Sequence, residues 1–346
     1  ICSAMVLFMT PGLAFFYGGL VRASSVVSMM MMSIGSLGLI GVMWVLFGYA
    51  VSFSGAGTGQ FYGWDGVAGI DLSKIGLEDV FNAAKGGDGL GLAFAGFQGT
   101  FAIITVALIS GAIADRARFG SWMVFAGLWA TIVYFPVAGW IFNFTVKDGK
   151  VVDGGWLVYN VGVLDFAGGT VVEVASGASA LALALVLGKR FGFTKGMHAP
   201  HNVPLVLIGV AILWFGWFGF NAGSELAADG VASLAFINTL AAPVGAMVCY
   251  GPRESIPWFF AYVVLTVPDP AGPEIGPGRF AMLAAVEVGA SDVHLAPDGR
   301  CEDRGPRSTV PGEVARGGDD LEAVDLDHVA DAQRALGQDD EAADVV

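Results

Sequence analysis

Long stretches without Asp, Glu, Lys or Arg dominate the first 250 residues of this chain. They cover residues 1–21, 23–64, 89–114, 119–146, 174–188, 196–224 and 230–252. A helix needs about 20 apolar residues to cross the hydrocarbon core of a bilayer. Only 14% of the 346 residues are charged, whereas soluble domains have about a quarter. The pattern argues against a water-soluble enzyme and predicts a polytopic membrane protein.

The apolar stretches predict an all-α fold, a bundle of membrane-spanning helices. We expect spans near 3–21, 29–53, 92–114, 120–143, 166–188, 203–222 and 231–250. The fifth span is unusual because Asp165 stands at its start and Glu173 lies inside it. The seventh span has the weakest pattern. Gly and Ala recur through these segments and allow membrane helices to pack closely.

Basic residues in the short connections predict the orientation of the bundle. Six cations follow the first, third and fifth spans: Arg22, Arg116, Arg118, Lys189, Arg190 and Lys195. The loops after the second and fourth spans carry four cations, diluted among seven acids. Cytoplasmic loops are enriched in Lys and Arg. We therefore expect the odd-numbered loops in the cytoplasm and the N-terminus outside the cell membrane.

Two clusters place aromatic side chains where lipid-facing leucine is the ordinary residue. Phe97 and Phe101 are four residues apart and share a helix face, which fits either packing or a gate. Trp217, Phe220 and Ser224 lie on one stripe at the end of the sixth span. Aromatic faces and a hydroxyl acceptor suit a small cation that carries N–H donors. An aromatic belt at the membrane interface is the alternative for the second cluster.

Two acids in the fifth span form the third cluster. Asp165 can cap the start of the helix by accepting backbone N–H bonds there. Glu173 lies inside the span, where an ionisable residue is costly and indicates function by default. It either lines a pore or pairs with another group. His198 and His201, before the sixth span, are too few ligands for a metal site and suggest a hydrogen-bonded turn. We expect no cofactor and no metal, and the three scattered cysteines indicate no disulfide framework.

The chain resembles the ammonium transporter family (Amt/Mep/Rh) over roughly residues 3–248. The similarity rests on five motifs: Phe8–Arg22, Phe97–Phe101, Asp165–Thr170, Pro200–Asn202 and Gly216–Ser224. The resemblance implies an eleven-helix fold with inverted halves, a homotrimer and one narrow pore in each subunit. It also implies ammonium or ammonia as the solute. A PII-type signalling protein can dock on the cytoplasmic loops and tail of family members.

The resemblance also implies roles for the aromatic residues. Trp217 and Ser224 would form an outer recruitment site for ammonium. Phe101 and Phe220 would be the stacked gate beneath it, and Phe97 would lie beside the outer site.

The resemblance implies a role for each acid as well. Asp165 would favour the cation without touching it. Glu173 stands where family members usually have the first of two pore histidines, although some fungal members carry Glu there. The usual outer-site tryptophan aligns with Phe142, or with Trp156 if the intervening loop is an insertion.

Residues 251–346 have a different character from the rest. They hold 7 Arg, no Lys and 19 acids, a net charge of −12, whereas residues 1–250 have a net charge of −2. They also hold 9 of the 14 prolines and no clear apolar run of 20 residues. This composition fits an acidic, disordered regulatory tail. It fits better a reading frame that departs from the ancestral one near residues 244–250, so that the second inverted half is missing.

These features predict a protein that transports ammonium or ammonia through a narrow pore and is not an enzyme. Two alternatives come from other classes of protein. The first is an ammonium-sensing membrane module whose tail is the output element. The second is an unrelated membrane enzyme that uses Glu173 or His198, and it needs a second catalytic group at the same depth.

Overall fold

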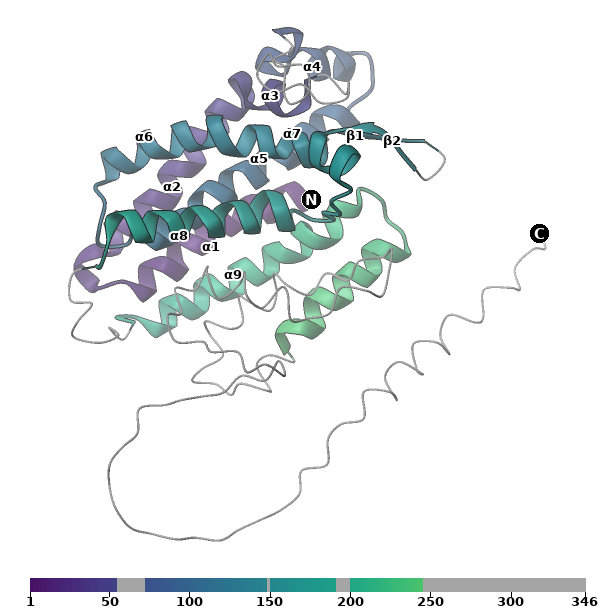
Figure 1. The fold of residues 1–346 in the computed structure, drawn as a ribbon. Helices are drawn as coiled ribbons and strands as arrows, with labels where there is room; N and C mark the ends of the chain where they lie inside the picture. The colour runs from purple at the N-terminus through teal and green to yellow at the C-terminus, as the bar shows by residue number, and fades with distance from the viewer. Residues whose placement is uncertain (55–71, 148–149, 191–199, 245–346) are drawn as a thin grey trace, which may run out of the picture. The chain divides into compact units, whose positions relative to one another are not determined.

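The computed structural model describes residues 1–54, 72–147, 150–190 and 200–244, and its fold is shown in Figure 1. The predicted tail, His198 and the last part of the predicted seventh span lie outside these residues. The helices are α1 (Cys2–Leu20), α2 (Val26–Met43), α3 (Tyr49–Phe53), α4 (Glu78–Lys85), α5 (Leu90–Ile109), α6 (Phe119–Trp129), α7 (Phe135–Phe142), α8 (Ala175–Leu187), α9 (Val203–Asn221) and the apolar helix Gly230–Val244.

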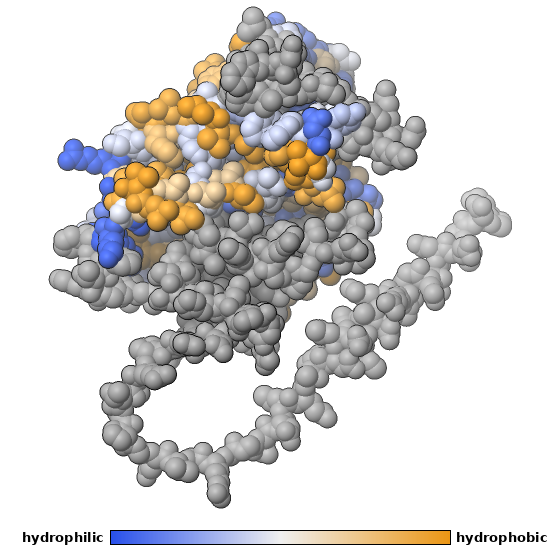
Figure 2. Space-filling view, in the orientation of Figure 1, coloured by the Kyte–Doolittle hydropathy of each residue, from blue (hydrophilic) through white to orange (hydrophobic). Residues whose placement is uncertain are grey.

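Six helical segments in the described residues are long and apolar enough to cross a membrane. They are Cys2–Leu20, Ala23–Phe53, Leu90–Ile113, Phe119–Phe142, Gly169–Leu187 and Val203–Glu225. The first six predicted spans are therefore confirmed as membrane-length helices. Large apolar side chains are exposed along these helices. Examples are Leu128 in α6, Ile132 in the turn that follows α6, and Leu185 and Val186 in α8. Figure 2 shows this apolar surface along α6 and α8.

The all-α prediction missed one short hairpin. Strands β1 (Phe144–Lys147) and β2 (Lys150–Gly154) pair antiparallel between the fourth and fifth spans. β1 contains Phe144, Thr145 and Val146, and β2 contains Val151 and Val152, which are residue types that favour extended backbone. The hairpin does not change the class of the fold.

Helices α1 and α9 pack against each other at very short range. A Cβ atom built on Gly209 of α9 would lie 2.3 Å from the backbone N of Phe16 and 2.7 Å from the carbonyl O of Gly12. A Cβ atom on Gly216 would lie 2.1 Å from Cγ of Met9. Small residues allow this approach, which is the common way for helices to associate where hydrophobicity gives no driving force. The α1–α9 pair therefore brings the first and sixth spans together.

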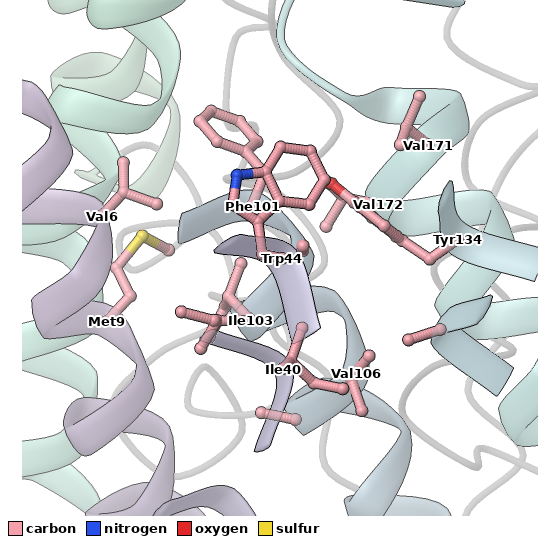
Figure 3. Close-up of a cluster of buried hydrophobic side chains, with 14 of the residues drawn as sticks. Val6, Met9, Ile40, Trp44, Phe101, Ile103, Val106, Tyr134, Val171 and Val172 are labelled. Carbon is pink, nitrogen blue, oxygen red and sulfur yellow. The ribbon is translucent and has the colours of Figure 1, made fainter. Parts of the chain in front are cut away.

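Helix α5 is at the centre of the bundle. Every residue from Phe97 to Ala107 is buried. Figure 3 shows Phe101 and Ile103 of this helix among Val6 and Met9 of α1 and Trp44, which follows α2. A helix that is apolar on all sides is expected to be enclosed by others. The aromatic cluster on α5 is thus held inside the protein.

An ion pair joins the first and third spans at one end of the bundle. Arg22 Nη2 lies 3.1 Å from Asp115 Oδ1, Arg22 Nε donates to Oδ2 at 3.1 Å, and Ser25 Oγ donates to Oδ1. At the same end, His201 Nδ1 lies 2.8 Å from the carbonyl O of Val21. His201 therefore contacts the end of the first span and not a neighbouring turn residue, so the predicted hydrogen-bonded turn of His198 and His201 stays a prediction.

The Asp115 cluster predicts a loss of stability in acid. Burial by itself raises the pKa of Asp115, but hydrogen bonds from Arg22 and Ser25 and the charges of Arg22 and Arg190 outweigh it and lower that pKa below its ordinary value. The ionised Asp115 therefore stabilises the folded state. This stabilisation is complete above the ordinary carboxyl pKa, and it is lost as the pH falls through the lowered pKa of Asp115. We expect Asp115→Asn to lower the Tm at neutral pH, and the difference from wild type to shrink as the pH falls from 7 through the lowered pKa of Asp115. Melting curves of both proteins across this range measure it, and a constant difference would contradict the prediction.

Candidate functional site

Four aromatic rings from α5 and α9 meet inside the bundle. The Phe97 and Phe101 rings are 4.7 Å apart and edge to face, and the Phe101 and Phe220 rings are 4.4 Å apart with a tilt of 37°. The Trp217 ring lies 5.6 Å from that of Phe220. Trp217 is only 4% exposed, which is unlike a side chain in an interfacial belt. The structure therefore brings the predicted gate residues together, tilted rather than parallel.

Ser224 follows the aromatic residues at the end of α9. Its Oγ donates to the carbonyl O of Phe220 at 2.7 Å. Because the hydroxyl proton is used in this bond, the Oγ lone pairs can accept from another donor. A Cβ atom on the neighbouring Gly223 would lie 3.3 Å from Cζ of Phe97 and 2.7 Å from Cβ of Cys2. The glycine thus lets the start of α1 and the Phe97 ring approach this end of α9.

Asp165 caps the fifth span, as predicted. Its Oδ1 accepts from Gly168 N at 2.5 Å, and its Oδ2 accepts from Thr170 N at 2.7 Å and Val171 N at 3.2 Å. Each such bond stabilises by about 1 kcal/mol, and a carboxylate also suits the positive end of the helix dipole. Gly168 has a φ of +112°, a conformation that favours glycine, and a Cβ atom there would lie 3.7 Å from Cδ1 of Phe101. The capping loop therefore supports the Phe101 ring.

Glu173 lies in a π-helical turn, Gly169–Val174, that begins the fifth span. The side chain is partly buried, next to the fully buried Val171 and Val172. Such π-helical turns often occur at functional sites. The backbone O of Glu173 accepts from Ser176 Oγ at 3.3 Å. Glu173 therefore lies in irregular helix, eight residues after Asp165, which precedes the helix.

The two candidates for the outer-site tryptophan take different places. The Phe142 ring packs edge-on to Phe101 with ring centroids 6.4 Å apart. Trp156 packs edge-on to Trp140 at 5.5 Å and is 38% exposed. Phe142 is therefore the candidate whose ring contacts the gate.

The sequence reasoning missed two hydroxyl residues below the gate. Thr105 lies one helical turn after Phe101 on the same face, and its Oγ1 donates to the Phe101 carbonyl at 2.6 Å. Tyr134 is fully buried, and its hydroxyl lies beside Thr105 without the alignment of a hydrogen bond. Figure 3 shows the Tyr134 side chain reaching inward beside Val172. The four-residue spacing from Phe101 could have identified Thr105, whereas no sequence signal singles out Tyr134.

The assembled groups suit a small cation that donates hydrogen bonds. Aromatic faces attract such a cation by about 0.5–2 kcal/mol each, and a hydroxyl oxygen adds an acceptor. The described residues hold no group of three His, Cys, Asp or Glu side chains that could bind a metal ion. Recognition of an N–H-bearing cation is therefore the chemistry that these residues offer.

Known proteins resemble this chain over the same region. The sequence model of the family described as "Ammonium Transporter Family" matches residues 1–254. An ammonium transporter of Mycobacterium tuberculosis is 48% identical over 258 residues, which are 72% of this chain and 54% of that protein. Ammonium transporter Amt1 of Archaeoglobus fulgidus is 42% identical over 245 residues, 70% of this chain and 56% of that protein.

Solved structures agree with the sequence comparisons. The crystal structure of Saccharomyces cerevisiae Mep2 matches with a TM-score of 0.63 and 32% identity, over 83% of this chain and 63% of that chain. A structure named Sensor Amt Protein matches with a TM-score of 0.62 and 26% identity, over 83% of this chain and 66% of that chain. The chain spans about half the length of the curated relatives it matches. This multi-pass membrane protein belongs to the ammonium transporter family.

Proposed function

We propose that residues 1–254 form one half of a path for ammonium or ammonia across the cell membrane. The observation that carries this proposal is the buried contact between Phe101 of α5 and Phe220 of α9, with Trp217 and Ser224 on the same helix as Phe220. Two helices that are far apart in sequence thus supply one aromatic site. The chain acts as a transporter component and not as an enzyme.

The physical task at this site is to remove water from a small cation. Transfer of an ion into an apolar pore costs several kcal/mol or more. Rings at Trp217 and Phe220 and the Ser224 oxygen offset part of that cost while the cation loses its water. The carboxylate of Asp165 adds a negative field, although its oxygens are used by backbone N–H groups.

In this proposal the rings of Phe101 and Phe220, which are 4.4 Å apart, close the path, so the solute must displace them. Beyond them, Thr105 and Tyr134 offer hydroxyl groups inside the bundle. Glu173 is the ionisable side chain of the fifth span, Gly169–Leu187. We assign it to hold the cation or to accept its proton. Inverted-repeat transporters enclose their sites between two halves, and the described helices provide one of them.

The homotrimer is proposed from the family membership, and the orientation is proposed from the charges of the loops. We propose a homotrimer with the N-terminus outside, because the short connections after the first, third and fifth spans carry the excess of Arg and Lys. Docking of a PII-type protein involves the tail and loops, and remains a prediction because residues 251–346 lie outside the described part.

A chimaera tests whether this half is competent. Residues 1–248 are joined to the remaining half of the M. tuberculosis relative and expressed in cells without their own ammonium transporters. We expect uptake of radiolabelled methylammonium, and we expect Asp165→Ala to reduce it about tenfold or more, since a lost cap and field of about 1.4 kcal/mol correspond to that factor.

Asp88→Ala is the matched control. Asp88 caps Leu90 through one exposed bond of 3.2 Å and lies away from the rings, so uptake should persist. A chimaera that reaches the membrane but takes up no methylammonium would contradict the transport proposal. If that chimaera still binds methylammonium, the result favours the sensing alternative.

A further inference from the structure

A positively charged cluster lies at the end of the bundle where α8 ends. Arg116 follows the third span, and its Nη1 donates to the carbonyl O of Gly188 at 2.6 Å and approaches that of Ala184 at 3.4 Å. These carbonyls end helix α8, where a cation suits the negative end of the helix dipole. Arg116 therefore ties the third span to the fifth.

A second guanidinium lies close to the first. Burial and then the charge of Arg190 lower the pKa of Arg116, so the two positive charges repel each other. The acid that faces them is Asp115, and both of its oxygens are engaged by Arg22 and Ser25. Nε of Arg116 is buried and makes no hydrogen bond to any described residue. The cluster holds like charges together without a matching anion of its own.

The charges around this cluster are almost all positive. The described residues at this end include one acid, Asp115, and the basic residues Arg22, Arg116, Arg118, Lys189 and Arg190. The loop after α8 continues outside the described residues. Within the described part, the pairing of Asp115 with Arg22 therefore leaves an excess of positive charge around Arg116 and Arg190.

The cluster follows two membrane-length helices, so we expect it at the depth of lipid headgroups. Arg116 comes directly after the span Leu90–Ile113, and Arg190 directly after the span Gly169–Leu187. Next to Arg190, Leu185 is 74% exposed and Val186 is 82% exposed. Figure 2 shows hydrophilic surface at these ends of α6 and α8 beside the apolar surface along both helices. A molecule with an anionic head and apolar chains matches both surfaces.

We propose that Arg116 and Arg190 bind the phosphate of an anionic phospholipid, whose acyl chains lie against Leu185 and Val186. Guanidinium groups bind phosphate with two parallel hydrogen bonds, and a phosphate between two guanidiniums removes their repulsion. Juxtamembrane cations of this kind attract anionic lipid. The site would stabilise the junction of the third and fifth spans in a membrane that contains such lipids.

The test compares the full chain in lipid nanodiscs of two compositions. One contains phosphatidylcholine alone and the other includes a quarter of phosphatidylglycerol. We expect phosphatidylglycerol to raise the Tm of the wild type by several degrees and Arg190→Gln to abolish most of that rise. Arg118→Gln removes the same charge from an exposed position at this end and should keep the rise.

Two further measurements fix the source of the phosphate and guard against misfolding. Inorganic phosphate added to the phosphatidylcholine nanodiscs should not reproduce the rise, and native mass spectrometry should show phosphatidylglycerol retained by the wild type but not by Arg190→Gln. An equal rise in wild type and Arg190→Gln would mean a diffuse surface effect and overturn the site. A rise with inorganic phosphate alone would overturn the assignment to lipid. These results do not depend on methylammonium uptake.

Discussion

Replacement of Gly209 by alanine is expected to disrupt the bundle. The new methyl group would lie 2.3 Å from the Phe16 backbone N and 2.7 Å from the Gly12 carbonyl O. These are backbone atoms and cannot rotate away, so α1 and α9 must separate along their whole contact. Overpacking of this kind costs about 3 kcal/mol. We expect a large loss of folded protein after extraction in detergent and a Tm well below that of the wild type.

Gly38→Ala is the matched control for this prediction. Gly38 lies in α2, is exposed, and has no atom within 4 Å of a Cβ built on it. Alanine has the higher helix propensity, so this change should leave the Tm unchanged or raise it. Size-exclusion profiles and melting curves of the two variants measure the difference. Equal Tm values for Gly209→Ala and the wild type would show that α1 and α9 are not packed at this distance.

Hydropathy was sufficient to predict the membrane-length helices because a bilayer imposes one length on every span. It could not show where helical geometry changes within a span. The π-helical turns at Trp44–Gly48, Ala130–Tyr134 and Gly169–Val174 each change the register of the side chains that follow. The burial of Tyr134 and the position of Glu173 depend on such turns, and neither follows from an ideal helical period.

The candidate site was only partly predictable for a similar reason. The contact within the Phe97–Phe101 pair follows from helical spacing alone. The contact of Phe101 with Phe220 joins residues on separate spans, and it depends on how α5 and α9 cross, which the motifs indicated only through a family resemblance. Asp165 was predictable as a cap because capping is local, and its three N–H partners lie within six residues. The choice between Phe142 and Trp156 needed the structure.

Changes at the outer site and at the gate beneath it should have the largest effect on recognition of the solute. The faces of Trp217 and Phe220 and the Ser224 oxygen are the groups that can replace water around an ammonium-type cation. Phe220→Leu keeps an apolar side chain but removes a π face, which is worth about 1 kcal/mol or about fivefold in Kd. Ser224→Ala removes the acceptor and should weaken binding by a similar factor. Both changes together should weaken binding about 25-fold, the product of the two factors.

The most direct test of this account is equilibrium binding of radiolabelled methylammonium to the purified full chain. Phe215→Leu is the matched control, because Phe215 lies on the same helix as Phe220 but is 54% exposed on the outside of the bundle. We predict saturable binding by the wild type and the Phe215→Leu variant, and strongly reduced binding by Phe220→Leu and Ser224→Ala. Binding that is the same in all four proteins would contradict an aromatic site for the cation on α9.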